Sequence, residues 1–313
     1  MDEQELKRQL SFIPKLEGNL SRTEIKEFDN VIVCGMGGSA LAARILFFLD
    51  PTFPVWLHDD YGLPAKNEGK VLYIAISYSG NTAETLSFVK EALKKKYSLI
   101  IITSGGVLLD LAIKNKILHI LIPSGFVPRN AVLYMLRALL YVINRENLFL
   151  ESDARLFDFS KASEHGLEFG KKFENKIPLI YASRENQALA YIWKIVLNET
   201  GKIPAFVNYF PELAHNEIQG LVSETAGSVA EHLKVLLLLD REDSNELSRV
   251  MTVFQSTASA YGVEVFSLDL PEGKTNKLLY VLSVASATAQ VVARSHGVDA
   301  NSAPFIEKLK TLL

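Results

Sequence analysis

Short apolar runs alternate with longer segments of helical periodicity along the whole chain. In the first half the pattern predicts strands over 31–34, 55–57, 71–76, 99–102 and 117–122, separated by helices over 40–49, 82–96, 108–114 and 131–144. The second half repeats it, with strands over 178–182, 205–207, 235–239 and 263–268 and helices over 187–199, 244–261 and 276–296. Such alternation is typical of βαβ units. Because the strands are continuously apolar, we expect parallel sheets covered by helices on both faces.

The repeated pattern predicts two α/β domains, residues 1–152 and 153–313, each a flavodoxin-like three-layer sandwich. A length of 313 residues suits two domains. We expect the domains to be joined near the polar stretch 151–164. Residues 303–313 are predicted to form a separate C-terminal helix that Pro304 opens, since proline is favourable in a first helical turn.

Composition narrows the class of protein. With 48% hydrophobic and 22% charged residues, the chain is neither disordered, collagen-like nor a disulfide scaffold. Lys plus Arg is 33 against Asp plus Glu at 36, which argues against binding to nucleic acid. The single cysteine, Cys34, can form no internal disulfide and begins no cysteine-type zinc site.

The expected compartment follows from the same composition and from two segments of the chain. One cysteine suits a reducing compartment, and residues 1–10 lack the apolar core of a signal peptide. Residues 278–293 are shorter than the ~20 apolar residues that span a bilayer, so we interpret them as a buried helix. We therefore expect a cytoplasmic protein without a membrane segment.

A glycine-rich loop, Gly35-Met36-Gly37-Gly38-Ser39-Ala40, follows the first strand and opens the first helix. Small residues there let backbone N–H groups approach an anion at the positive end of a helix. The loop also fits a dinucleotide fingerprint, with Asp59 and Asp60 about 20 residues on, where a ribose-binding acid would lie. A tight turn without any ligand is the third interpretation.

The loop after the 71–76 strand favours a phosphate ester. It reads Ser77-Tyr78-Ser79-Gly80-Asn81-Thr82 and runs directly into a helix. A helix cap needs one hydroxyl, whereas Ser77, Ser79 and Thr82 supply three, which suits a phosphate dianion at a helix N-terminus. Another small polar turn, Thr103-Ser104-Gly105-Gly106, ends the next strand at the same carboxyl edge, where open α/β sheets bind ligands.

The ordered set of motifs resembles the sugar isomerase (SIS) fold and, within it, the two-domain phosphoglucose/phosphomannose isomerases of archaea and some bacteria. The resemblance spans nearly the whole chain. Its motifs are the three loops above together with Pro128-Arg129, Asn198-Glu199, Pro211-Glu212-Leu213-Ala214-His215-Asn216 and Lys310.

The resemblance implies aldose–ketose isomerisation of a hexose 6-phosphate through a cis-enediol, with no metal or redox cofactor. It implies Glu199 as the general base and His215 as the group that assists ring opening, supplied by the partner subunit of a homodimer. It also implies that Lys310 reaches the ring oxygen or O1 and that Arg129 stabilises the enediolate. Without the resemblance, each of these four would pass as an ordinary surface charge.

The implied substrate-binding residues gather in the first domain. Four hydroxyls are expected to bind the phosphate and two glycine amides to line the approach to the sugar: Ser39, Ser77, Ser79, Thr82, Gly37 and Gly38. One position departs from the family. Members thought to accept mannose 6-phosphate as well as glucose 6-phosphate carry Thr before the proline of the last helix, whereas this chain carries Ala303.

Three other functions compete with the isomerase. A non-catalytic sugar-phosphate sensor would be expected to carry a partner domain, and none is visible beside the two SIS domains. The isomerase half of a glucosamine 6-phosphate synthase would need a glutaminase that starts with cysteine, which Met1-Asp2-Glu3 does not supply. An NAD-dependent dehydrogenase rests on the glycine fingerprint alone.

Overall fold

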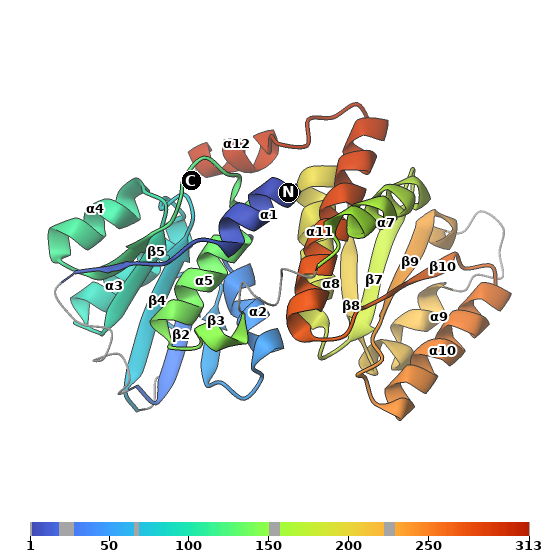
Figure 1. Cartoon of the computed structure of the whole chain (residues 1–313), viewed down its shortest axis with the longest axis horizontal. Coiled ribbons are helices and arrows are strands. Elements are labelled where there is room, and N and C mark those ends of the chain that lie inside the picture. The colour runs from blue at the N-terminus through green and yellow to red at the C-terminus, as the bar shows by residue number, and fades with distance from the viewer. Residues whose placement is uncertain (1, 19–27, 66–68, 150–156, 222–228, 313) are drawn as a thin grey trace. The chain divides into compact units, whose positions relative to one another are not determined.

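The computed structural model describes residues 2–18, 28–65, 69–149, 157–221 and 229–312 (Figure 1). The chain divides into two compact units. One comprises Gln4–Ser152 with Leu309–Leu313, and the other Asp153–Lys308 with Met1–Glu3. They are called here the N-terminal and C-terminal domains, and the expected boundary between 152 and 153 lies outside the described residues.

The N-terminal domain contains a six-stranded sheet in the order β1-β6-β5-β4-β2-β3. Five of these strands are parallel to one another, and β1 runs antiparallel beside β6. Their bounds are β1 Leu16–Glu17, β2 Asn30–Cys34, β3 Val55–His58, β4 Val71–Ser77, β5 Leu99–Thr103 and β6 Leu118–Leu121.

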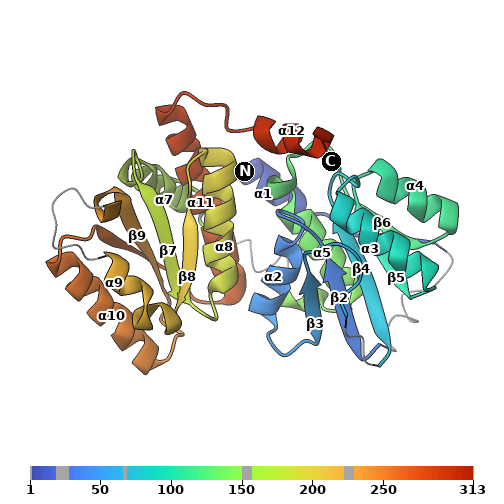
Figure 2. The ribbon, with the colours of Figure 1, turned by 180° about the vertical axis from the view of Figure 1, so that it is seen from behind.

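Helices cover both faces of this sheet, as Figures 1 and 2 show. On one face α3 and α4 bury an apolar cluster that includes Cys34, Tyr73 and Phe88. On the other face α2 packs against α5. The helices are α1 Glu3–Leu10, α2 Leu41–Leu49, α3 Ala83–Lys94, α4 Gly106–Asn115 and α5 Val132–Val142, with short 3-10 turns η2 Pro128–Asn130 and η3 Glu146–Leu148.

The C-terminal domain contains a four-stranded, wholly parallel sheet in the order β10-β9-β7-β8. The strands are β7 Ile177–Ser183, β8 Phe206–Phe210, β9 Leu233–Leu239 and β10 Val265–Asp269. On one face α11 packs against α7 and α8. On the other face α9 and α10 bury the aromatic cluster around Tyr181, Phe210 and Phe254.

The remaining elements belong to this domain, except that the end of α12, from Leu309 on, belongs to the N-terminal domain. They are α7 Phe159–Lys172, α8 Gln187–Val196, the π-helix η4 Leu197–Gly201, the 3-10 turns η5 Glu212–His215 and η6 Val229–His232, α9 Glu217–Leu221, α10 Asn245–Ala260, α11 Lys274–Ser295 and α12 Pro304–Leu312. The predicted α/β fold, with parallel sheets flanked by helices and a helix at the C-terminus, is confirmed.

Three local predictions need correction. The polar stretch 151–164 is not all linker, because α7 begins at Phe159 behind Asp158, whose side chain accepts a hydrogen bond from the Lys161 N–H. The helix predicted over 187–199 is α-helical only to Val196 and continues as a π-helix. The pattern also missed α1 and the two-residue strand β1, since neither carries a long apolar run.

The interpretation of residues 278–293 as a buried helix is confirmed. Among the described helices, α11 alone is long and apolar enough to cross a membrane, and 67% of its most apolar window is buried inside the protein.

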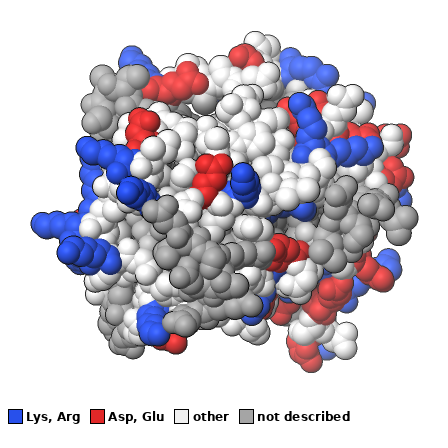
Figure 3. Space-filling view, turned by 60° about the vertical axis from the view of Figure 1, so that its left-hand side comes forward, with Lys and Arg blue, Asp and Glu red and all other residues white. Residues whose placement is uncertain are grey.

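On the face seen in Figure 3, basic side chains lie in separate groups, with acidic side chains among them and uncharged areas between.

Candidate active site

The loop after β4 is held in shape by its own hydroxyls. Ser77 is buried, and its Oγ lies 2.9 Å from the Thr82 Oγ1 and accepts a hydrogen bond from the Gly80 N–H. Thr82 is the N-cap residue of α3, yet its side chain makes no capping bond to that helix. Its hydroxyl pairs with Ser77 instead, so the first turn of α3 is not closed by its own cap.

Two neighbouring loops meet at this edge of the sheet. Ser77 lies opposite Thr103 in the parallel register of β4 and β5. Gly80 has φ +68, and a Cβ there would lie 1.8 Å from the Gly105 carbonyl oxygen. Only glycine fits such an approach. The predicted convergence of the two small polar turns is therefore present.

The glycine-rich loop approaches the predicted enediolate-stabilising arginine. A Cβ on Gly38 would lie 2.9 Å from the Arg129 backbone N and Cα, so glycine allows this contact. Gly37 adopts φ +50 with open space on its Cβ side. Arg129 itself is only 3% exposed, which removes the interpretation of a surface salt bridge.

Tyr78, to which the sequence assigned no role, joins four loops at this edge. Its N–H donates to the Ser39 Oγ at 3.2 Å, and its carbonyl accepts from the Ser104 hydroxyl at 2.7 Å. Its own hydroxyl donates to the Pro123 carbonyl at 3.0 Å and accepts from the Phe126 N–H at 2.9 Å. Burial raises the pKa of Tyr78, so the phenol stays protonated as a donor.

Gln9, in α1, was also missed. It is fully buried, and its side-chain amide donates to the Asn130 carbonyl at 2.6 Å while its oxygen accepts from the Leu133 N–H at 3.0 Å. It thereby caps α5. The N-cap residue of that helix, Ala131, makes no side-chain capping bond of its own. No local pattern could reveal this brace, because 121 residues separate its two ends.

In the C-terminal domain, Glu199 lies in the middle of η4 and is half-buried. η4 continues α8 as its last turn, and π-helical turns are rare in proteins. Asn198 fixes the chain beyond the turn, since its side-chain oxygen accepts from the Ala205 N–H at 2.8 Å. Lys202 ends the π-helix in a left-handed conformation and donates to the Glu199 carbonyl.

His215 ends the 3-10 turn η5 and is exposed. The Asn216 side-chain amide donates to the Glu212 carboxylate at 3.0 Å. Among the described residues, this amide makes no hydrogen bond to His215. The turn is anchored two residues later, because the Glu217 carboxylate accepts from the Tyr181 hydroxyl at 2.5 Å and from the Asn208 amide.

Glu199 and His215 lie on either side of β8 in the order of the chain, with Glu199 before the strand and His215 after it. A five-residue strand rises by about 3.3 Å per residue, so roughly 16 Å of strand separates the two. Lys310 lies in α12, and its side chain is outside the described residues.

Charged side chains lie at the carboxyl edge of the second sheet, whereas hydroxyl side chains lie at that edge of the first sheet. Asp240 directly follows β9, the central strand that corresponds to β4. Its carboxylate pairs with the buried Lys277 ammonium at 2.6 Å and accepts from the Asn186 amide at 2.9 Å. Glu242 binds the same ammonium at 2.9 Å.

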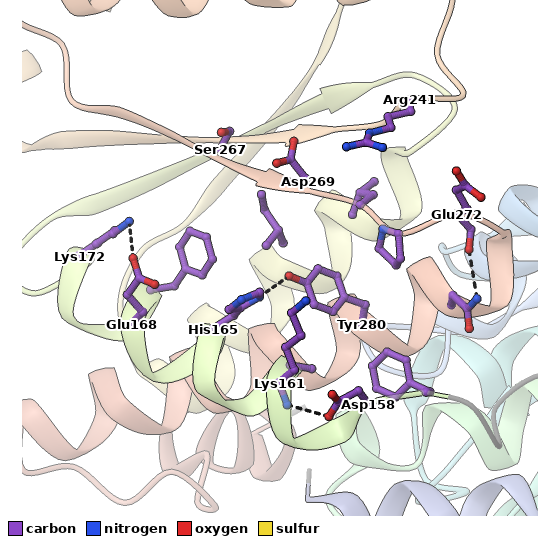
Figure 4. Close-up of a pocket in the computed structure, with 17 residues that line it drawn as sticks. Asp158, Lys161, His165, Glu168, Lys172, Arg241, Ser267, Asp269, Glu272 and Tyr280 are labelled. Carbon is purple, nitrogen blue, oxygen red and sulfur yellow. Dashed lines mark hydrogen bonds and ion pairs between the residues drawn. The ribbon is translucent and has the colours of Figure 1, made fainter.

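The C-terminal domain also has a hollow of about 680 Å³ along β10 and α7 (Figure 4). His165 and Tyr280 lie next to each other in its lining, with the His165 Nδ1 2.6 Å from the Tyr280 hydroxyl. Its described lining includes none of the predicted site residues, and it lies at the edge of the sheet opposite β8.

Among the described residues, no group of three or more His, Cys, Asp or Glu is placed to hold a metal ion.

Comparison with known proteins identifies the family. The model of the bacterial phospho-glucose isomerase C-terminal SIS domain matches residues 163–313. A bifunctional phosphoglucose/phosphomannose isomerase of Thermoplasma volcanium is 34% identical, over 92% of each chain. A D-glucosamine-6-phosphate 4-epimerase of Sulfolobus acidocaldarius is 30% identical over 72% of this chain and 74% of that protein.

The fold has solved relatives as well. The crystal structure of a hypothetical protein from Thermus thermophilus superposes with a TM-score of 0.75 at 17% identity, covering 99% of this chain and 86% of that one. Sequence identity over nearly the full length, the SIS-domain match and the shared fold agree with the loop motifs. The chain belongs to the bifunctional phosphoglucose/phosphomannose isomerase family.

Proposed function

We propose that the protein interconverts glucose 6-phosphate and fructose 6-phosphate, and also takes mannose 6-phosphate. The observation that carries this proposal is the hydroxyl-lined loop of Ser77 and Thr82 at the uncapped start of α3, in a chain of this family. Hydroxyl and amide donors at a helix N-terminus suit a phosphate dianion. The proposed ligands are Ser39, Ser77, Ser79 and Thr82, with the amides of Gly37 and Gly38 toward the sugar.

The proposed chemistry is a proton transfer within the open-chain sugar. The Glu199 carboxylate removes the proton from C2, and the electron pair forms the C1=C2 double bond of a cis-enediolate while the C1 carbonyl becomes a negative oxygen. The proton then returns from Glu199 to C1, and the O2 proton passes to O1, so that C2 becomes the ketone. The buried Arg129 stabilises the negative oxygen of the enediolate. His215 and Lys310 assist ring opening. The residue before Pro304 is Ala303 rather than Thr, so we propose lower turnover with mannose 6-phosphate than with glucose 6-phosphate.

A coupled assay tests the proposal, with fructose 6-phosphate supplied in EDTA and glucose 6-phosphate measured. Replacing a general base is expected to cost at least ~10²-fold in kcat, so Glu199→Gln should lose turnover and retain phosphate-ligand binding. Glu174→Gln, at an exposed glutamate of the same domain, is the matched control. Undiminished turnover in Glu199→Gln removes it from the mechanism, and binding without turnover in the unmodified protein favours a sensor.

The epimerase relative supplies a second candidate. If this chain acts at C4 of glucosamine 6-phosphate, that substrate will yield galactosamine 6-phosphate and fructose 6-phosphate will remain unchanged. Nuclear magnetic resonance of the products separates the two activities in one experiment.

We also propose that the enzyme is a cytoplasmic homodimer in which His215 enters the partner's site. The separation of Glu199 from His215 by the length of β8 supports this arrangement. Mixing inactive Glu199→Gln with inactive His215→Ala should restore about a quarter of normal activity, because half of the C2 dimers would then contain one complete site of two. No restoration, with subunit exchange verified, would place both residues in one chain's site.

A further inference from the structure

Lys202 has an unusual backbone conformation at the end of η4. Its φ is +58 and its ψ is 33, in the left-handed region. For a residue with a side chain this conformation costs about 1–2 kcal/mol, which glycine would avoid. Such outliers persist where the surroundings hold them in place, and they cluster at functional sites. Four other described residues, among them Lys116 at the end of α4, share this conformation, so the contacts of Lys202, rather than its backbone, set it apart.

The Lys202 ammonium joins two segments that are far apart in sequence. It donates to the Glu199 carbonyl and to the Ser302 carbonyl, 100 residues away. Carbonyls at the end of a helix lack partners within it and favour a cation, so the first contact closes the turn that carries Glu199. The second contact holds the chain two residues before α12 begins at Pro304.

The segment 299–303, which contains Ser302, also carries an acidic residue. The Asp299 carboxylate accepts from the Asn301 N–H at 2.9 Å. That hydrogen bond lowers the pKa of Asp299, and the Lys202 charge acts in the same direction. The ammonium of Lys202 therefore contacts two carbonyl oxygens, and its charge also acts on the Asp299 carboxylate.

We propose that Lys202 is a positioning residue, which sets the place of Glu199 by tying η4 to the segment 299–303. This inference rests on the proposed role of Glu199 as the base. Packing holds η4 against α8 and α11, and the Lys202 ammonium adds the contact to the segment before α12. Without the ammonium, the Glu199 backbone would lose this tie to the start of α12.

Three substitutions of Lys202 separate positioning from stability. Lys202→Met keeps the aliphatic stem and loses both hydrogen bonds. Lys202→Gly loses them too but relieves the backbone strain. Both are expected to lower kcat for fructose 6-phosphate about tenfold, with KM within about twofold, because small misplacements of a base are costly while phosphate binding is untouched. Lys202→Arg, which restores a cation that can donate to both carbonyls, should recover most of the lost turnover.

Hydrogen exchange of the 299–303 amides provides a readout that does not depend on activity. Protection is expected to fall at least about tenfold in Lys202→Met, as local opening becomes easier. Lys171→Met, at an exposed lysine of α7, is the matched control and should change neither readout. Normal kcat in Lys202→Met overturns the positioning role, and unchanged exchange overturns the tie to Ser302. If the unmodified protein isomerises no hexose phosphate, the proposed function fails, and exchange alone decides the tie.

Discussion

Removal of the Lys277 ammonium is expected to destabilise the C-terminal domain strongly. Lys277 is 1% exposed, and it neutralises Asp240, which is 9% exposed. In Lys277→Met the aliphatic stem remains and the carboxylate keeps neutral donors, including the Asn186 amide. Removing one partner of a buried ion pair leaves an uncompensated charge and costs about 3–5 kcal/mol. At roughly 2–4 °C per kcal/mol for a domain of this size, the midpoint of thermal unfolding should fall by about 10 °C.

Differential scanning calorimetry and urea unfolding measure this loss. Lys161→Met is the matched control, because Lys161 is exposed in the same domain and the described part of the chain gives it no ion pair. It should change stability by no more than about 0.5 kcal/mol. The double variant Lys277→Met with Asp240→Asn removes both charges and should recover part of the loss. A loss below about 1 kcal/mol in Lys277→Met alone would refute the assignment of a buried, uncompensated charge.

The pH dependence of this loss has a defined sign. The hydrogen bond from the Gly273 N–H, followed by that from Lys277, lowers the pKa of Glu242, so its contribution is present at neutral pH and is lost as the pH falls through the folded pKa. Burial would lower the pKa of Lys277, but hydrogen bonds to Asp240 and Glu242 outweigh it and raise that pKa, so its contribution persists until strongly alkaline pH. The difference between the native protein and Lys277→Met should therefore be steady near neutral pH and shrink in acid.

Three further outcomes are expected in the N-terminal domain. Tyr78→Phe loses one hydroxyl with two hydrogen bonds and should cost about 1–3 kcal/mol of stability by urea unfolding, together with a drop in turnover. Gly38→Ala places a methyl group against the Arg129 backbone and should raise KM or lower kcat in the coupled assay, whereas normal kinetics would mean that the loop yields. Burial raises the pKa of Cys34 to about 12, so the native thiol should resist a disulfide reagent at about pH 8 and react only after unfolding.

The sequence was sufficient where structure follows from local pattern. The apolar runs before Ser77 and Thr103 form adjacent parallel strands, and both strands finish at the same edge of the sheet. The glycines at positions 38 and 80 stand where another backbone comes within contact distance. Because parallel strands align their carboxyl ends, loop composition alone predicted which loops would meet.

Prediction failed where a distant segment decides the local structure. Gln9 caps α5 through an amide 124 residues away, and Lys202 bonds a carbonyl 100 residues away. Neither contact has a periodicity or motif. The apolar pattern of 187–199 predicts one α-helix to its end, because that pattern does not reveal the change from α- to π-type hydrogen bonding after Val196. The pairing of Asp240 with Lys277 likewise joins a loop to a helix that begins 34 residues later in the chain.

The two sheets differ at their carboxyl edges, and this difference bears on the proposal that the catalytic unit needs two chains. In the first domain the loop after the central strand presents the hydroxyls of Ser77 and Thr82, whereas in the second the equivalent position holds Asp240, already neutralised by Lys277. A second phosphate there would meet carboxylates instead of hydroxyl donors. The C-terminal domain offers its candidate chemistry from the two ends of β8, which roughly 16 Å of strand keeps apart. This separation supports the proposal that Glu199 and His215 act together from different copies of the chain.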